Sequence, residues 1–592
     1  MEVDKIVEEL RSEKTSNQAR LNALQKAATL AEKGKGKALL DSGIASVVFS
    51  LLKPSVSALT IGTAAYAINV LAKEDLDVMA DEALKGDNLS SLVKFLNDKE
   101  RGRKGVVENS ACALVQLCLD SRIREKVRET EGSFATFNQL LQLKQPHIVE
   151  AIANLVDVLS EDAASQVAMK DNGILKSFAL LLENSDYTKA IEDTLSALHN
   201  LARSESQENR GALREAGIIS PLVGLLGKKL SKKSSANVVD RALLLLAELA
   251  EDEVNREEIG RKGGVEKVLS LLKRTDLEED TRSSAASALF NLVIDNENNQ
   301  LEVLNNEGIK TVVKLLKSES VQESAFGIIF NLAGHDSCRD AIREAEALPI
   351  LLESLENPFQ DIQDYALKAV SNMVVSSEVN SNEVVRLGGV PGVVRLLSSN
   401  HDDLLIACCN CIMNMCEHEQ AQQAFGSAGA IDALLPLLSA PKPEIVSVAA
   451  STLADLALNT DNQERIGADA MKRLVDLLLP TEDISVRTQA ARSIANLTDR
   501  NEQNQVRAHE AKIELRLVEL LSHSQEEVVL YALQAISSLV EHAQVKEELL
   551  SQNLRSSLET VLKGASEANR KEAQSIIDRL DGKGKGAPEG DS

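Results

Sequence analysis

The chain repeats one pattern along most of its length, and this repetition restricts the possible folds more than any other feature. The stretch SSAASALFNLVIDNENNQLEVLNNEGIKTVVKLLKS, residues 283 to 318, reads as a helix carrying one asparagine, a tight turn, a short helix, a glycine and a second long helix. Almost every other part of the 592-residue chain is a variation on it. Such repetition predicts helical units that stack on their neighbours.

An asparagine in an Ala-x-x-Asn-Leu motif marks the same point in many units, which we call the ladder position. Seven asparagines hold it: Asn154, Asn200, Asn291, Asn331, Asn372, Asn414 and Asn496. Other residues hold it in five further units: Val70, Gln116, Glu248, Asp455 and Ser538. The twelve positions are 38 to 48 residues apart. A period near 42 residues with helical hydrophobicity predicts an armadillo or HEAT type solenoid.

A glycine followed by a run that ends in paired leucines is the second mark of a unit. Examples begin at Gly217, Gly263, Gly308, Gly388 and Gly429. Glycine adopts the left-handed conformation that a sharp corner between two helices requires. Each helix also carries one apolar stripe with spacing i, i+3, i+4, i+7, and a unit can bury its stripe only against neighbouring units.

Period, glycine corner and asparagine together resemble the armadillo-repeat family, which includes β-catenin, importin-α, the vacuole-anchored armadillo proteins and the Rap-type GDP-dissociation stimulators. The resemblance covers roughly residues 15 to 580. It implies an all-α, right-handed α-α superhelix of about twelve armadillo repeats. We therefore predict an N-terminal cap at 1–14, an armadillo-repeat solenoid at 15–580 and a disordered tail at 581–592.

Composition agrees with an all-α chain and bears on its partners. Aromatic residues make up 2%, tryptophan is absent, and no run alternates with period two. A net charge of −25 predicts repulsion of nucleic acid and of anionic lipid, and attraction of basic partner segments. An equally weighted explanation is that the charge keeps a large exposed surface soluble.

Sequence signals of location favour the cytoplasm, with the nucleus as the other candidate. The first residues, MEVDKIVEELRSEK, are charged from the start and do not resemble a secretory signal. No apolar run approaches the ~18 residues of a membrane span, so we predict no direct membrane insertion. Seven cysteines placed mostly in helices suit reduced thiols.

The residues four before the ladder positions predict which surface binds partners. They share a helix face with the ladder, and they are polar or small: Glu150, Ser196, Ser287, Gly327, Lys368, Asn410 and Arg492. We expect the third helix of each repeat to face an open concave groove. Asparagine carries both a donor and an acceptor, so a row of them can bind the backbone of an extended peptide. An equally weighted alternative is that each asparagine bonds within its own repeat and helps to set the superhelix.

We therefore predict a partner-binding groove along the ladder. Its candidate residues are Asn154, Asn200, Glu248, Asn291, Asn331, Asn372, Asn414, Asp455 and Asn496. Glu248 and Asp455, with Glu150, are expected to hold lysine or arginine of a partner, whereas Lys368 and Arg492 oppose a uniformly acidic groove. Importin-α uses tryptophan four residues from asparagine in its nuclear-signal pockets. This chain has no tryptophan, so those pockets cannot be carried over.

Three local patterns carry further predictions. Cys408, Cys409, Cys411, Cys416 and His418 lie within eleven residues, but on one helix or just beyond it. A metal site needs ligands from converging elements, so we predict thiols packed between helices. An Asn or Gln near the start of most first helices is expected to cap them. The basic stretch at 227–237 is predicted to be a loop that is solvated, contacts an acidic partner or carries a modification site.

No catalytic constellation, phosphate loop or metal motif emerges, and we predict no enzyme and no cofactor. The function predicted is a scaffold or adaptor that holds extended or basic segments of other proteins in the groove. A second hypothesis, which rests on resemblance alone, is a regulator or chaperone of small GTPases. A third is a structural element of a cytoskeletal or axonemal assembly.

Overall fold

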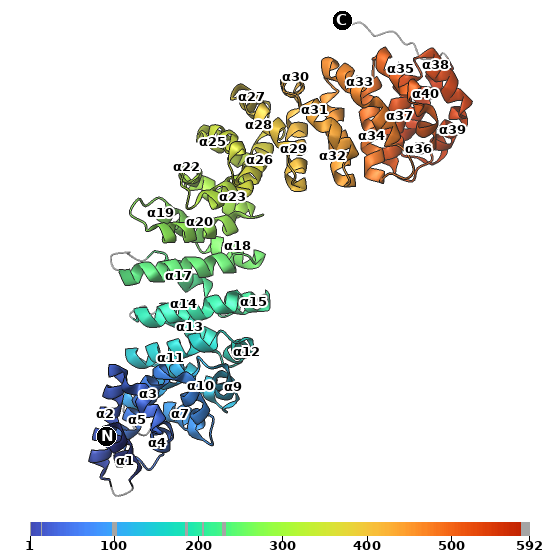
Figure 1. Cartoon of the computed structure of the whole chain (residues 1–592). Helices are drawn as coiled ribbons and strands as arrows, with labels where there is room; N and C mark the ends of the chain where they lie inside the picture. The colour runs from blue at the N-terminus through green and yellow to red at the C-terminus, as the bar shows by residue number, and fades with distance from the viewer. Residues whose placement is uncertain are drawn as a thin grey trace. The chain divides into compact units, whose positions relative to one another are not determined.

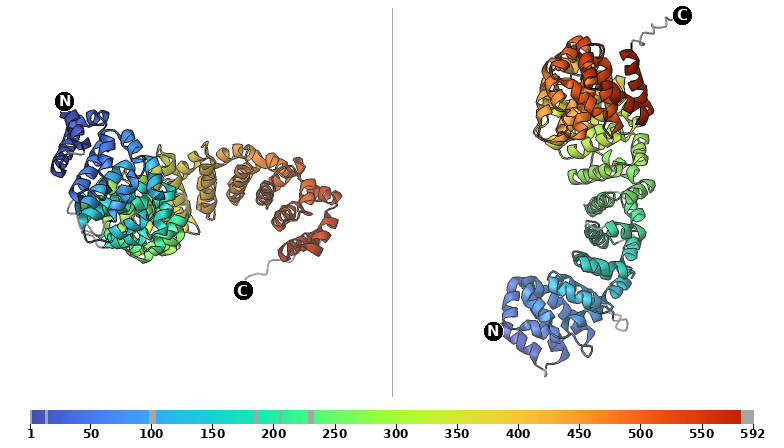
Figure 2. Two further views of the ribbon diagram at one scale, coloured as in Figure 1. Left: turned by 90° about the horizontal axis from the view of Figure 1, so that it is seen from below. Right: turned by 90° about the vertical axis from the view of Figure 1, so that its right-hand side faces the viewer.

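The computed structural model of the chain is built from α-helices joined by short turns (Figures 1 and 2). It describes residues 2–12, 15–97, 104–183, 187–203, 207–227 and 233–581. None of the residues in these ranges belongs to a β-strand, which confirms the prediction of an all-α chain. The helices form two compact units, Met1–Thr311 and Val312–Ser592.

The longest helices recur once per repeat, and we call them third helices. In each unit they pack against one another in chain order. In the first unit they are α2 (Asn17–Leu30), α5 (Ala58–Glu74), α8 (Lys104–Leu117), α11 (Pro146–Leu159), α14 (Thr188–Ala202), α17 (Lys233–Leu249) and α20 (Glu279–Val293). In the second they are α23 (Gln322–Ala333), α26 (Gln360–Val374), α29 (Asp402–Met415), α32 (Pro443–Leu456), α34 (Ile484–Thr498), α37 (Glu526–Leu539) and α40 (Glu567–Leu580). Each of the twelve ladder positions lies on one of the helices α5 to α37.

Shorter first and second helices connect the third helices. The first helices are α3 (Gly36–Asp41), α6 (Leu76–Ala83), α9 (Ser121–Glu129), α12 (Ala163–Asp171), α15 (Gln207–Glu215), α18 (Glu253–Arg261), α21 (Glu297–Asn305), α24 (Asp336–Glu344), α27 (Glu378–Arg386), α30 (Glu419–Ser427), α35 (Glu502–Glu510) and α38 (Ala543–Ser551). The second helices are α4 (Ile44–Ser50), α7 (Asn88–Leu96), α10 (Ser133–Leu141), α13 (Ile174–Glu183), α16 (Ile219–Leu225), α19 (Gly264–Leu272), α22 (Gly308–Leu315), α25 (Ala347–Glu353), α28 (Val390–Leu396), α31 (Ala430–Leu434), α36 (Ile513–Leu520) and α39 (Leu554–Gly564). One helix, α33 (Thr460–Asp476), takes both places, and α1 (Glu2–Arg11) precedes the repeats.

The predicted glycine corner is present in most repeats. Gly217, Gly263, Gly388 and Gly429 all have positive φ, between 75° and 87°. Gly308 is the exception, because the left-handed residue there is Glu307, with φ of 52°. Gly308 is required for space instead: a Cβ on it would lie 2.7 Å from Cγ1 of Val303. Lack of a side chain, and not backbone freedom, therefore explains this glycine.

Two lysine-rich stretches contain helical residues, although 227–237 was predicted to be a loop. The stretch 33–37 is a kinked helical turn, with Gly34 at φ 79° between α2 and α3. In the stretch 227–237, residues 233–237 already belong to α17. Residues 228–232 lie outside the described residues, as do residues 98–103 and the tail from 582 onward.

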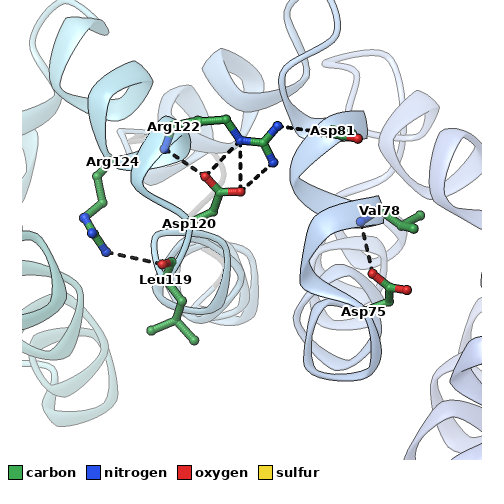
Figure 3. A network of polar contacts seen from close by, with 7 residues as sticks. All are labelled: Asp75, Val78, Asp81, Leu119, Asp120, Arg122 and Arg124. Carbon is green, nitrogen blue, oxygen red and sulfur yellow. Dashed lines mark hydrogen bonds and ion pairs between the residues drawn. The ribbon is translucent and has the colours of Figure 1, made fainter.

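Aspartates cap several first helices and tie neighbouring repeats together. Asp75 accepts the backbone N–H of Val78 at 3.2 Å, and Asp120 accepts that of Arg122 at 2.8 Å (Figure 3). The Arg122 guanidinium also holds Asp81 of the preceding repeat at 2.8 Å (Figure 3). Such caps satisfy N–H groups that a helix start leaves free.

The asparagines predicted as caps of the first helices are not caps. These are Asn255, Asn299, Asn380, Asn462 and Asn504, and all are buried at the third helical position. The caps lie three residues earlier: Asp252, Asn296, Ser377, Asn459 and Asn501. An asparagine does cap three of these helices, one turn earlier than expected, whereas Asp252 and Ser377 cap the other two.

Candidate partner-binding surface

In the second unit, an open depression lies over the third helices α26 and α29. Its volume is about 290 Å³. The ladder residue Asn372 lines it, together with Lys368, four residues before it, and Asn410 from the next helix. Phe330 of α23 and Asp403 of α29 complete its polar and aromatic rim. The structure therefore brings ladder residues and the residues four before them to one surface.

In the first unit, a similar depression of about 350 Å³ spans α5, α8, α11 and α14. The ladder residues Gln116 and Asn154 line it, with Glu150 four residues before the latter. In the first repeat Val70 is buried, and the neighbouring Asn69 lines the depression in its place.

Four ladder asparagines each bond from their own third helix to the third helix of the preceding repeat. The side-chain N–H of Asn291 donates to Ala247 O at 2.9 Å, and that of Asn496 donates to Ala454 O at 2.8 Å. Asn372 donates in the same way to Phe330 O, and Asn414 to Ser371 O, both at 3.3 Å. The acceptor is always the residue just before the ladder position of the preceding repeat. These asparagines therefore link repeats, so the expectation that they bond within their own repeat is wrong for them.

The other three ladder asparagines bond differently. Asn331 donates to Gly327 O of its own helix at 2.8 Å, as the alternative prediction required. Asn200 donates to Ser160 Oγ at 2.8 Å. Asn154 reaches forward to Asp193 Oδ2 at 3.4 Å. All seven ladder asparagines are partly exposed, so their remaining polar atoms can meet solvent or a partner.

Glu248, one of two acidic ladder residues, already lies near a histidine and an arginine of the chain. Its carboxylate lies 3.7 Å from His199 Nε2 and 3.9 Å from a terminal guanidinium nitrogen of Arg210. Burial lowers the pKa of His199, and the nearby Glu248 opposes that shift. A partner lysine or arginine would therefore compete with Arg210 for this carboxylate.

Asp455, the other acidic ladder residue, is paired with Arg492 on the following third helix. Arg492 also donates to Ser451 Oγ at 2.9 Å. Burial raises the pKa of Asp455 even though Arg492 opposes that shift. Lys368 is paired as well, with Asp364 at 2.6 Å. The two cations expected to oppose an acidic groove are thus neutralised locally.

The cysteine cluster on α29 is packed inside the repeat stack. Cys408, Cys409, Cys411 and Cys416 are all buried. Burial raises the pKa of Cys409 to about 11 and that of Cys411 to about 12. Thiols with such pKa values stay protonated near neutral pH and behave as small apolar groups, which agrees with the packing prediction.

Sequence reasoning missed two features, one in the interior and one on this surface. The first is a row of buried asparagines on the first helices: Asn504 donates to Gln463 O at 3.0 Å and to Leu497 O at 2.9 Å, which joins adjacent repeats. The second is a half-exposed aromatic pair beside the second-unit depression, Phe330 and Tyr365. A signal for Phe330 was present, because it directly precedes a ladder asparagine and so falls outside the apolar stripe.

Comparison with known families decides the identity of the repeat. A model of the plant U-box protein armadillo-repeat region matches residues 174–373, and an armadillo-like model matches residues 390–576. The chain is an armadillo-repeat protein. Armadillo repeats generally serve as protein-binding scaffolds and are typically non-catalytic.

Several armadillo relatives resemble parts of the chain. It is 28% identical over 252 residues to importin subunit alpha-1a of Oryza sativa subsp. japonica, which covers 41% of this chain and 48% of the importin. It is 30% identical over 142 residues to vacuolar protein 8 of Candida albicans, which is 24% of each chain. The chain thus spans about half or less of the length of these curated relatives.

Solved structures show the same armadillo fold. An engineered protein is 26% identical with a TM-score of 0.64, covering 69% of this chain and 98% of its own. A structure from work on the interaction between cadherin and β-catenin is 16% identical with a TM-score of 0.61, covering 90% of this chain and 99% of its own.

Among the described residues, every helix is too short or too polar to cross a bilayer.

Proposed function

We propose that this armadillo-repeat chain is a non-catalytic scaffold that holds extended or basic segments of partner proteins on the ladder surface of its third helices. The observation that carries this proposal is the second-unit depression, where the ladder residue Asn372 lies with Lys368 and Asn410 on one open surface. Polar side chains that line an open depression across successive helices suit a long, narrow ligand better than a small enclosed one.

The hydrogen-bonding capacity left on the ladder supports this reading. An asparagine amide has two donor hydrogens and one acceptor oxygen. In Asn372 the bond to Phe330 O uses one hydrogen. Its Oδ1 receives no donor from the part of the chain that the structure describes. One hydrogen and the oxygen therefore remain for an extended backbone, which offers both groups at each residue.

Charge supports a basic partner. The net charge of −25 attracts basic segments and speeds their encounter.

The proposal is tested by blocking the second-unit depression without removing an asparagine bond between repeats. Asn410 is exposed and lines this depression, so Asn410→Arg adds bulk and positive charge there. The matched control is Asn22→Arg at an exposed position on α2. Proteins captured from a cell extract by wild type, Asn22→Arg and Asn410→Arg are identified by mass spectrometry.

We expect partners that wild type and Asn22→Arg retain but Asn410→Arg loses. Both variants should unfold at the wild-type temperature, because both sites are exposed. Capture of the same proteins in the same amounts by all three chains would contradict the proposal for this surface.

A further inference from the structure

Two aromatic rings lie side by side next to the second-unit depression. The ring centroids of Phe330 on α23 and Tyr365 on α26 are 6.1 Å apart, and the ring planes are tilted by 37°. Both residues are partly exposed, whereas Phe326 on the same helix as Phe330 is fully buried. The pair therefore forms part of the surface and not of the core.

Carboxylates from three successive third helices surround this pair. Burial raises the pKa of the Tyr365 hydroxyl, and the negative charges of Glu323, Asp364 and Asp361 raise it further. Glu323 lies on α23, and Asp361 and Asp364 lie on α26. Asp403 adds a fourth carboxylate from α29, inside the depression.

Little positive charge compensates these carboxylates. Lys368 is the cation that lines the depression, and it binds Asp364 Oδ2 at 2.6 Å. The Oδ1 atom of Asp364 is buried and accepts no hydrogen bond from the residues that the structure describes. Glu323, Asp361 and Asp403 are exposed and form no ion pair within those residues, although Lys442, which pairs with the adjacent Asp402, also interacts electrostatically with Asp403. Carboxylates therefore outnumber cations around the rings.

We infer that the Phe330–Tyr365 pair and the carboxylates around it bind an arginine side chain of a basic partner segment. A planar guanidinium stacks on aromatic faces and donates several hydrogen bonds to carboxylates at once. A lysine ammonium is more strongly hydrated and does not stack, so it fits this site less well. The inference rests on the proposed function, and it names the side chain that one part of the surface selects.

The test uses two synthetic probes of equal charge, fluorescein-labelled octa-arginine and octa-lysine. Their binding to the full chain is measured by fluorescence anisotropy at fixed ionic strength, because salt screens such contacts. We expect octa-arginine to bind more tightly than octa-lysine. Tyr365→Leu should weaken octa-arginine binding roughly three- to tenfold, the range expected for a lost cation–π contact. Tyr365→Phe keeps the ring and should bind as wild type does.

A charge control distinguishes binding at this site from general electrostatic attraction of a basic probe to an acidic protein. Asp403→Asn removes one carboxylate inside the depression, and Asp476→Asn removes one exposed carboxylate on α33. We expect Asp403→Asn to weaken octa-arginine binding more than Asp476→Asn does. Circular dichroism melts of each variant confirm that the fold is intact.

Three results would overturn the inference: equal binding of both probes, no effect of Tyr365→Leu, or no binding to wild type. If octa-arginine binding is lost in Asn410→Arg but kept in Tyr365→Leu, the scaffold proposal stands and the arginine site fails. If partner capture does not depend on Asn410 while Tyr365→Leu still weakens octa-arginine binding, the arginine site stands and the scaffold proposal fails for this surface.

Discussion

The buried amide of Asn504 fills the space that a side chain on Gly467 would need. A Cβ built on Gly467 would lie 1.9 Å from Asn504 Oδ1. The two residues lie on α33 and α35, so glycine in one repeat admits the asparagine of the next. The same relation recurs at Gly260 with Asn299 and at Gly426 with Asn462, each at 1.8 Å. This pairing is a repeated contact between neighbouring first helices.

Gly467→Ala is expected to destabilise the second unit. The added methyl group must displace the Asn504 amide and its two backbone bonds. Overpacking of a tight core typically costs about 1–3 kcal/mol, whereas alanine in place of glycine favours a helix by about 1 kcal/mol. We expect a net loss of about 1 kcal/mol, measured as a lower midpoint of thermal or urea unfolding. The control is Gly211→Ala in α15, where the nearest atom is 3.8 Å away, and its midpoint should rise.

Asp157 on α11 should make stability depend on pH. Burial raises its pKa to about 6 from the usual 3.8, although a hydrogen bond from Ser196 opposes the shift. Between these two pH values the folded chain binds more protons than the unfolded chain, so stability falls as pH rises. The loss is complete above pH 6 and is on the order of 3 kcal/mol.

Asp157→Asn should therefore raise the unfolding midpoint clearly at pH 8 and hardly at all at pH 4. Asp171→Asn, at an exposed position on α12, changes the net charge equally and is the matched control. A rise of the same size at both pH values for Asp157→Asn would contradict the buried-carboxylate explanation.

The ladder asparagines Asn291 and Asn331 should differ when they are replaced by alanine. Asn291 links α20 to Ala247 O of α17, whereas Asn331, within the described part of the chain, bonds only to Gly327 O of its own helix. Asn291→Ala loses a bond between repeats worth about 1 kcal/mol. Asn331→Ala loses only a bond within one helix, and the better helix propensity of alanine, about 0.6 kcal/mol, favours both variants equally, so the difference between them comes from the bond between repeats.

Hydrogen–deuterium exchange read by mass spectrometry measures this difference locally. Asn291→Ala should speed exchange in α17 and α20, while Asn331→Ala should leave exchange in α23 near the wild-type rate. Equal effects of the two substitutions would show that the linking bond contributes nothing measurable.

Periodicity predicted the fold well because it records burial in every repeat. The ladder motif fixed the register of the third helices, and Gly217, Gly263 and Gly388 marked real corners. Gly308 shows the limit of this reasoning. It has the same sequence pattern as Gly263, but Gly263 is needed for its positive φ and Gly308 for its missing Cβ. Whether a glycine is needed for its φ or for its missing Cβ depends on the neighbouring side chain, here Val303.

The candidate surface was predicted only in outline. Spacing on a helix placed Asn372 and Lys368 on one face, and the depression lies there. Spacing could not reveal that Arg492 neutralises Asp455, because these residues lie 37 positions apart and meet only when repeats stack.

The sequence by itself determined the repeat, its length, the helix order and the face that carries polar residues. These follow from local periodicity, because the polar or apolar type of each residue indicates whether its position is buried. Tertiary structure alone decided which polar groups meet. Stacking turned Asn291 and Asn504 into links between repeats, and it placed Phe330 beside Tyr365. The physical reason is that hydrogen bonds, ion pairs and ring contacts act over a few ångströms, and such distances between repeats are set by packing.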